Sequence, residues 1–499
     1  MTWFRANWPG LALGAVVLAA VLAASSGVVG LAWDDGVYVA AGQALAHGKG
    51  YLLANRIGDQ AVPLYPAGYP LLVALAWLVA GSQSATFAAL ALFSGLCVSI
   101  AVFLWWRILR DVTSPGTAAL LVAVPALSYT ALLTGELRMA DAPYVLLVAA
   151  AAALWRRSLE SRWAMLALVL VAGAAVPFRT AGVVLPLAVA LLLLVRRRWA
   201  PALAVVAAAG ALHAVLLLTL RTPEPSYAEI VRAAWAHGGA GFDILRANLS
   251  RDVWTSVAAL VAPPIIYSSV VQRLVHGAGA LRFVYALAVW FICLAVAAGG
   301  WRRLRAERWE VGDLTFVGAV ALIFVMPLGM LPRFLVPVGP VLALWAWEGA
   351  GALGARWSKG LRVALLLVLA FTAVEAVRHV RSQPRVFRER AAAYAAAGEA
   401  ARVWLGRRGL IAAEFPETLW FEDGVRAVST TTPLENVQTA QVGLDAARRR
   451  LEPIARGCLL DTQTFPVSGE VFDAYAARPG AVVLGGLDRR YVRAVCWGT

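Results

Sequence analysis

Two adjacent carboxylates stand where the first long apolar run of the chain ends. Asp34 and Asp35 follow Trp33, and insertion of that run into a membrane does not require them. A carboxylate at the membrane surface suits a general base or a metal ligand, because nearby lipid lowers the dielectric constant and raises its pKa. Adjacent helical residues point about 100° apart, so one carboxylate can face a cleft while the other caps the helix predicted over about 37–47. Both are candidate catalytic residues.

Three isolated arginines, Arg138, Arg179 and Arg333, fall in short connections between apolar runs. A guanidinium binds a phosphate through two parallel hydrogen bonds and stays charged at physiological pH. At the membrane surface it would stabilise the negative charge that develops on a departing lipid phosphate. The alternative for each arginine is that its side chain only extends from a helix end to the membrane–water interface and binds no ligand.

The composition places these residues in a membrane protein. Of the 499 residues, 61% are hydrophobic and 15% are charged, whereas soluble domains have about 45–50% and about 25%. The mean hydropathy is +0.72, and a soluble enzyme is excluded. The net charge of +15 arises from short basic clusters between apolar runs. This pattern follows the positive-inside rule and excludes nucleic acid as a partner.

Apolar runs that could cross a bilayer recur along the chain, and we count about eleven. They cover about residues 9–31, 85–106, 117–134, 142–155, 163–178, 180–195, 200–220, 282–300, 313–331, 334–347 and 361–377. Arginine-rich connections alternate with arginine-poor ones. We therefore expect a multi-pass protein of the cytoplasmic membrane, with its N-terminus cytoplasmic and its C-terminus extracytoplasmic.

Three long segments are predicted on the outer side. They are a first loop at 32–84 with a half-inserted helix at about 69–80, a second loop at 221–281, and the tail 381–499, which follows a transmembrane domain of residues 1–380. The tail alternates short apolar runs with Ala- and Arg-rich stretches, which predicts a small α/β domain. Its Cys458 and Cys496 could form a disulfide if they lie on neighbouring strands. Its acidic residues are expected to form a solvated face: Glu414, Glu417, Glu422 and Asp423.

Four short motifs follow one another along the chain. The Asp34-Asp35 pair leads through a helix into a Gly-rich turn, and Val62-Pro-Leu-Tyr-Pro-Ala-Gly-Tyr-Pro-Leu-Leu comes next. Pro177-Phe-Arg-Thr-Ala-Gly and Leu331-Pro-Arg-Phe-Leu-Val-Pro follow downstream. In this order they resemble the GT-C glycosyltransferases that use polyprenyl-phosphate sugars. That superfamily includes the lipid A aminoarabinose transferases and the protein O-mannosyltransferases, and the resemblance is to glycosyltransferase family 39.

The resemblance implies a fold and an activity. The fold is an α-helical polytopic GT-C domain followed by the small α/β domain. The activity is transfer of a hexosyl or pentosyl group from a polyprenyl-phosphate donor to a cell-envelope glycan, lipid or protein at the outer face of the cytoplasmic membrane. Asp34 would then be the general base of a single, inverting displacement.

The resemblance also implies roles for further residues. In Thr134-Gly-Glu-Leu-Arg-Met-Ala-Asp-Ala-Pro, the family's acidic residue before the fourth span corresponds to Asp141, with Glu136 in reserve. Asp141 could orient the acceptor or, with Asp34, hold a divalent cation. No other cofactor is expected, and no metal site is assigned. The candidate substrate-binding residues are Arg333, Arg179, Arg138, Glu136, His47, Tyr65 and Tyr69.

One position departs from the family pattern. Some members carry a lysine in the Pro-rich segment that contacts the donor phosphate, whereas this chain has Tyr65 just before Pro66. The departure argues against aminoarabinose transfer itself.

Two other functions remain as alternatives. A transporter or flippase of a lipid-linked envelope precursor would place ionisable residues inside the bundle, whereas these apolar runs are almost free of charge. A non-catalytic envelope scaffold would leave Asp34, Asp35 and Arg333 without a role. The sequence carries no Walker, Rossmann, HExxH or nucleophile-elbow motif, which favours a lipid-linked donor over a nucleotide sugar.

Overall fold

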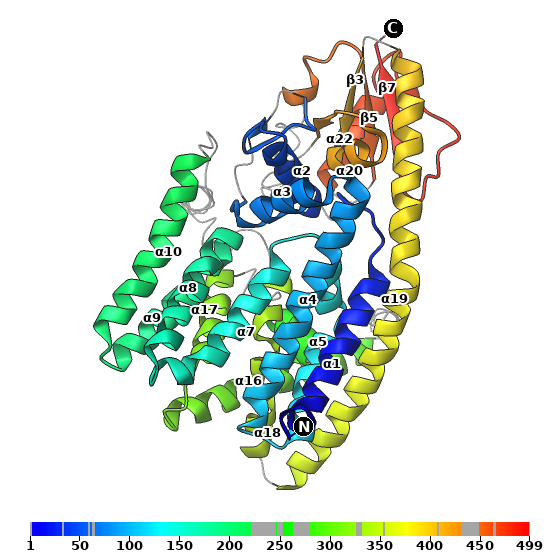
Figure 1. The fold of residues 1–499 in the computed structure, drawn as a ribbon. Helices are drawn as coiled ribbons and strands as arrows, with labels where there is room; N and C mark the ends of the chain where they lie inside the picture. Colours follow the sequence, from blue (N-terminus) through cyan, green and yellow to red (C-terminus); the bar gives the residue numbers. More distant parts are fainter. Residues whose placement is uncertain are drawn as a thin grey trace.

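The computed structural model describes residues 2–31, 34–57, 60–61, 65–220, 246, 253–262, 279–325, 332–352, 355–406, 409–430, 449–462 and 466–498. Figure 1 shows a bundle of long helices with a small sheet at one end, where the C-terminus lies, and the N-terminus at the other end. Asp34 begins α2 (Asp34–Ala46) beside the sheet. We call this end of the bundle the Asp34 end and the opposite end the Arg107 end.

Each predicted apolar run overlaps a helix or two adjacent helices, and residues 326–331 of the run 313–331 lie outside the described residues. The bundle contains α1 (Thr2–Ala24), α4 (Gln83–Arg110), α5 (Pro115–Ala126), α6 (Tyr129–Glu136), α7 (Asp141–Ser158), α8 (Arg162–Phe178), η1 (Thr180–Val183), α9 (Val184–Val195), α10 (Trp199–Thr219), α16 (Gly279–Arg305), α17 (Val311–Val325), η3 (Pro332–Val338), α18 (Gly339–Ala352) and α19 (Ala355–Leu405). Within the described residues, six helices are long and apolar enough to cross a membrane, or up to seven spans if the bent pair α5–α6 is one. Shorter apolar helices add to these. The predicted α-helical polytopic fold is confirmed.

Serine caps begin several helices of the bundle. The side chains of Ser82, Ser114, Ser128 and Ser161 each accept a hydrogen bond from the backbone N–H three residues on. Such caps satisfy first-turn N–H groups that have no partner within the helix. The cap at Ser128 follows a bend of 67° between α5 and α6.

The helices α16 and α18 approach each other closely because glycine occupies their contact. A Cβ atom at Gly349 would lie 1.9 Å from the carbonyl oxygen of Ala295, and one at Gly299 would lie 1.9 Å from that of Trp345. Small residues let helix backbones approach, and the resulting van der Waals contact stabilises helix pairs in lipid.

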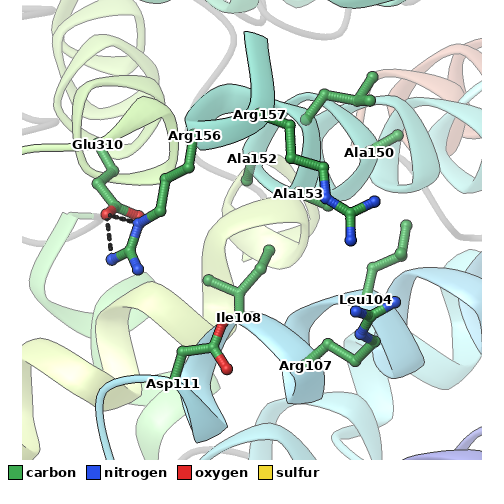
Figure 2. Close-up of a pocket in the computed structure, with 11 residues that line it drawn as sticks. Leu104, Arg107, Ile108, Asp111, Ala150, Ala152, Ala153, Arg156, Arg157 and Glu310 are labelled. Carbon is green, nitrogen blue, oxygen red and sulfur yellow. Dashed lines mark hydrogen bonds and ion pairs between the residues drawn. The ribbon is translucent and has the colours of Figure 1, made fainter. Parts of the chain in front are cut away.

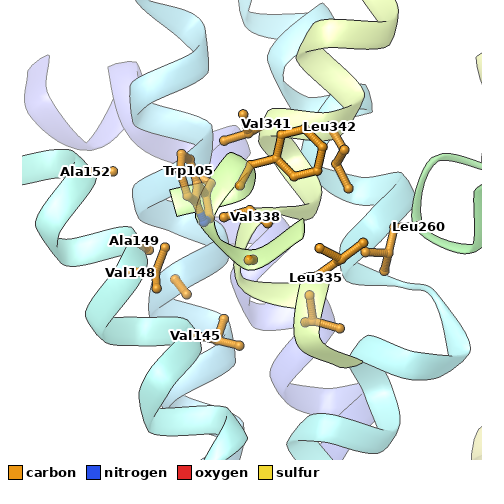
Figure 3. Packing of buried hydrophobic residues seen from close by; sticks show 14 of the residues in the cluster. Trp105, Val145, Val148, Ala149, Ala152, Leu260, Leu335, Val338, Val341 and Leu342 are labelled. Atoms are coloured by element: carbon orange, nitrogen blue, oxygen red, sulfur yellow. The ribbon is translucent and has the colours of Figure 1, made fainter. Parts of the chain in front are cut away.

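An apolar core holds η3 in place. Figure 3 shows Val145 and Val148 of α7, Trp105 of α4, and Leu335 and Val338 of η3 in one buried cluster. Since interiors are close-packed, this contact fixes η3 against α7. At the Arg107 end, the last turns of α4 and α7 carry arginines instead (Figure 2).

A layer of short elements covers the Asp34 end. It consists of α2, the hairpin β1 (Leu52–Leu53) and β2 (Gln60–Ala61), and α3 (Gly68–Ala80). The helices predicted over 37–47 and 69–80 are therefore confirmed. Of the predicted second outer loop, residues 221–245, 247–252 and 263–278 lie outside the described residues, and α13 (Val253–Val261) lies within them.

The tail contains a five-stranded sheet with strand order β4-β3-β5-β7-β6. The strands are β3 (Leu410–Ala413), β4 (Val428–Ser429), β5 (Gly457–Asp461), β6 (Val482–Val483) and β7 (Arg493–Trp497), and the helices are α20 (Pro416–Asp423) and α22 (Pro466–Ala476). Cys458 and Cys496 lie opposite each other on β5 and β7 and form a disulfide. The two cysteines thus lie on neighbouring strands, which is the condition that the sequence set for a bridge. The helix α19 is continuous through residues 380 and 381. The boundary between a transmembrane domain and the tail at this point therefore stays a prediction.

Buried acids join the tail to its surroundings. Glu417 of α20 is fully buried, and its Oε1 accepts a hydrogen bond from Arg56 Nε at 2.9 Å and lies 2.8 Å from Arg56 Nη2 in the same ion pair. Glu414 is also buried and accepts from the Thr462 N–H at 2.8 Å. The expectation of a solvated face is wrong for both, because donors on the first loop and on β5's end replace water. It holds for Glu422, which is exposed.

Candidate active site

The carboxylate of Asp34 lies at the N-terminus of α2 and joins three segments. Arg333 of η3 donates from Nη2 to Asp34 Oδ2 at 2.5 Å, and Tyr65 donates from its hydroxyl to Asp34 Oδ1 at 2.7 Å. The helix N-terminus adds a partial positive charge. The side chain of Asp34 is 16% exposed and that of Arg333 is 22% exposed, so both remain accessible to a ligand.

Asp35 points away from this pair into the protein. It is buried, and its Oδ2 accepts a hydrogen bond from the Gly30 N–H at 3.2 Å. Burial raises the pKa of Asp35 to about 6, against the lowering effects of the Gly30 hydrogen bond and the Arg138 charge. The two adjacent carboxylates therefore diverge as the helical geometry predicts, one partly exposed and one buried.

Arg138 lies beside Asp35 rather than Asp34. It is buried and donates hydrogen bonds to the Val28 carbonyl at 3.1 Å and to Ser25 Oγ at 3.2 Å. Its guanidinium also lies 5.4 Å from the centre of the Phe87 ring. These contacts tie the end of α1 to the start of α4.

A second ion pair lies next to the first. Asp141 begins α7, Arg179 follows α8, and the two buried side chains form an ion pair. The Arg179 guanidinium lies 4.4 Å from the centre of the Phe334 ring, and the Arg333 guanidinium lies 5.8 Å from the same ring. A face of Phe334 attracts cations. One aromatic ring thus holds together two guanidinium groups, each with its own carboxylate.

The other predicted site residues lie elsewhere. Glu136 is buried and pairs with His379 of α19, whose Nε2 lies 2.8 Å from Glu136 Oε2. His47 is exposed, and its Nδ1 lies 2.7 Å from the Gln43 carbonyl oxygen. Tyr69 is buried, and both Tyr65 and Tyr69 pack edge-on against one ring, that of Tyr38, at 4.9 Å and 5.4 Å.

The structure therefore brings together five of the predicted residues: Asp34, Arg333, Tyr65, Asp141 and Arg179. Sequence reasoning missed Phe334 and Tyr38. Both carried a signal, since Phe334 directly follows Arg333, and Tyr38 lies four residues after Asp34 on the same face of α2.

The donor set suits an anion better than a cation. Within the described part of the chain, no group of three or more His, Cys, Asp or Glu side chains could hold a metal ion. Asp34 and Asp141 are each paired with an arginine. A phosphate could compete with these carboxylates for both guanidinium groups.

Comparison with known proteins finds solved structures that share this fold. No protein-family model matches the chain, and no curated protein matches it. Among solved structures, ArnT from Cupriavidus metallidurans bound to undecaprenyl phosphate matches with a TM-score of 0.52 and 16% identity, over 97% of each chain. The apo state of ArnT from the same organism matches with a TM-score of 0.51 and 15% identity, also over 97% of each chain. At these identities the likeness establishes the fold, and the GT-C fold expected from the sequence is confirmed.

Proposed function

We propose that this chain is a membrane glycosyltransferase that takes a sugar from a polyprenyl-phosphate donor and gives it to a cell-envelope glycan, lipid or protein. The observation that carries the proposal is the partly exposed Asp34–Arg333 pair, with Arg179 against the same Phe334 ring as Arg333. This arrangement offers a carboxylate base next to two cations that can receive a phosphate. The fold it shares with an ArnT bound to undecaprenyl phosphate supports a lipid-linked donor.

In the proposed reaction, the donor phosphate replaces the Asp34 carboxylate as the partner of Arg333. Asp34 is then free to accept the proton from the acceptor hydroxyl or amine as that group attacks the anomeric carbon. The bond between that carbon and the phosphate oxygen breaks, and the sugar is transferred with inversion. Polyprenyl phosphate leaves with an added negative charge, which Arg333 and Arg179 stabilise. Tyr65 orients Asp34, and Asp141 orients Arg179.

The proposed placement in the cell follows from the arginine pattern. The Arg107 end carries the basic clusters and would face the cytoplasm. The Asp34 end, with its disulfide-bonded tail, would face the oxidising outer compartment. The donor would reach Asp34 from the outer leaflet.

The test is transfer of radiolabelled sugar by purified protein from synthetic polyprenyl-phosphate sugars, with analysis of the anomeric configuration of the product. Arg333→Ala is expected to reduce transfer at least about 100-fold, because it removes a charge-stabilising donor. Arg162→Ala is the matched control, since Arg162 is exposed at the Arg107 end. Equal transfer by Arg333→Ala and the control, or a product with retained configuration, would contradict the proposal.

A flippase of a lipid-linked precursor is the second candidate, and the buried Glu136–His379 pair favours it. Ionisable pairs inside a helix bundle mark transport pathways in many membrane proteins, and this pair joins α6 to α19. A flippase would move labelled donor across liposome membranes without releasing polyprenyl phosphate. The transferase would release it.

A further inference from the structure

A cavity of about 420 Å³ opens at the Arg107 end, far from the Asp34 site. It lies between the last turns of α4 and α7 and the residue that precedes α17. It is lined by side chains between Leu104 and Asp111 at the end of α4, by side chains of α7 between Ala150 and Arg157, and by Glu310. Volumes of this size are typical of ligand pockets.

Two arginines of this cavity have no partner in the described part of the chain. Arg156 is paired with Glu310, whose Oε1 accepts from Arg156 Nε at 2.8 Å. No hydrogen bond or ion pair joins the side chain of Arg107 or Arg157 to a described residue, and Figure 2 shows their guanidinium groups pointing toward each other. Two like charges that face one another across a hollow repel unless an anion lies between them.

Asp111 and the Arg156–Glu310 pair complete the polar side of the cavity, and the remaining lining is apolar. Leu104 and Ile108 of α4 face Ala150 and Leu154 of α7 across it, and all four side chains are half-buried. Leu104 lies on the same face of α4 as Arg107, because residues three apart share a helix face. It lies nearly one turn farther from the end of the helix, and so deeper in the bundle. The cavity therefore has a charged mouth at the helix ends, where three arginines lie with the carboxylates of Asp111 and Glu310, and an apolar wall toward the membrane interior.

Topology alone does not require this arrangement. Arg162 and Arg196 also lie at the Arg107 end, and both are exposed and outside the cavity. A basic cluster that only fixes orientation can extend into water in this way. Arg107 is instead half-buried against an apolar wall, and Arg157 is exposed at the outer edge of the cavity. A buried apolar wall beside unpaired guanidinium groups is the combination that an anionic amphiphile satisfies.

We propose that this cavity binds an anionic bilayer phospholipid, with its phosphate between Arg107 and Arg157 and an acyl chain along Leu104 and Leu154. Basic pockets between transmembrane helices bind anionic headgroups in this manner. The site is separate from the proposed transfer reaction, since it lies at the other end of the bundle. Its occupant would stabilise the contact between α4 and α7.

The test is native mass spectrometry of the full-length protein in detergent, titrated with phosphatidylglycerol or with phosphatidylcholine of the same acyl chains. Wild type is expected to retain phosphatidylglycerol in preference to phosphatidylcholine. The double variant Arg107→Gln/Arg157→Gln is expected to bind phosphatidylglycerol about 25-fold more weakly, since each arginine near the surface contributes about fivefold. The single variant Arg107→Gln, which perturbs the fold less, should lose about fivefold.

The matched control is Arg162→Gln/Arg196→Gln, which removes the same charge from the same end outside the cavity. It should bind phosphatidylglycerol within about twofold of wild type. Equal loss in the control and cavity variants would show non-specific attraction and overturn the proposal. Inorganic phosphate that displaces phosphatidylglycerol at equal concentration would also overturn it, since the apolar wall would then contribute nothing.

Discussion

Removal of the Arg56 side chain is expected to release the tail from the first outer loop. Glu417 is fully buried, and its Oε1 accepts a hydrogen bond from Arg56 Nε in an ion pair with Arg56. Arg56→Ala leaves this carboxylate with Asn55 Nδ2 at 3.4 Å as a much weaker donor. Breaking a buried ion pair by removing one partner costs about 3–5 kcal/mol, because the other charge stays buried without compensation.

Hydrogen exchange followed by mass spectrometry measures this loss locally. The Ile57 N–H donates to the Ala427 carbonyl at 3.2 Å, so exchange of peptides covering residues 52–57 and 416–430 reports on the contact. A loss of about 3–5 kcal/mol corresponds to exchange faster by about 150- to 4,000-fold in both peptides. Peptides from α4 and α7 should not change.

The exposed pair Arg385–Glu389 supplies the control. Its side chains are 79% and 39% exposed, so water and salt screen the pair and it contributes little to stability. Arg385→Ala should therefore alter exchange by less than about fivefold. The double variant Arg56→Met/Glu417→Leu should recover most of the protection, since apolar residues replace a buried pair at little cost. If Arg56→Ala exchanges no faster than Arg385→Ala, the reasoning is refuted.

Three further predictions concern stability. Reduction of the Cys458–Cys496 disulfide, which spans 38 residues, should destabilise the tail by about 4 kcal/mol, because the unfolded chain gains conformational entropy. The loss should appear as a lower Tm in dithiothreitol, and an unchanged Tm would contradict this prediction. Gly349→Ala should lower the Tm of the detergent-solubilised protein because its Cβ has no room, whereas Gly351→Ala on the same helix meets no atom within 4 Å and should be neutral or stabilising by up to about 1 kcal/mol; equal effects would contradict the close contact. Burial raises the pKa of Asp35 from its ordinary value of 3.8 to about 6 in the folded chain. Between about pH 4 and 6 the folded chain therefore keeps this proton while the unfolded chain loses it, and stability falls as pH rises through that window. Asp35→Asn should remove that pH dependence and be more stable above pH 6 by up to about 3 kcal/mol; a pH profile like that of wild type would refute the assignment.

The bundle follows from the sequence because each span is a local property. A run of apolar residues long enough to cross lipid must satisfy its own backbone hydrogen bonds, and it does so as a helix. The same local reasoning placed Asp34 at a helix start and separated it from Asp35. Cys458 and Cys496 were also identified, because only these two cysteines lie outside the apolar runs.

The pairing of charged residues did not follow from the sequence. Arg333 reaches Asp34 across 299 residues, Arg56 reaches Glu417 across 361, and His379 reaches Glu136 across 243. No local pattern encodes such contacts, since they depend on how helices pack. For this reason the sequence left Glu417 as a solvated acid and gave His379 no role.

Single-turnover kinetics of Asp34→Asn show whether Asp34 takes a proton during sugar transfer. The substitution keeps the size of the side chain and removes its basicity. With saturating polyprenyl-phosphate sugar, we expect transfer to slow by about 10²- to 10⁴-fold while the variant still binds the donor. Glu160→Gln, at an exposed acid of the Arg107 end, should transfer at the wild-type rate. Transfer by Asp34→Asn at the rate of this control would exclude Asp34 as the base.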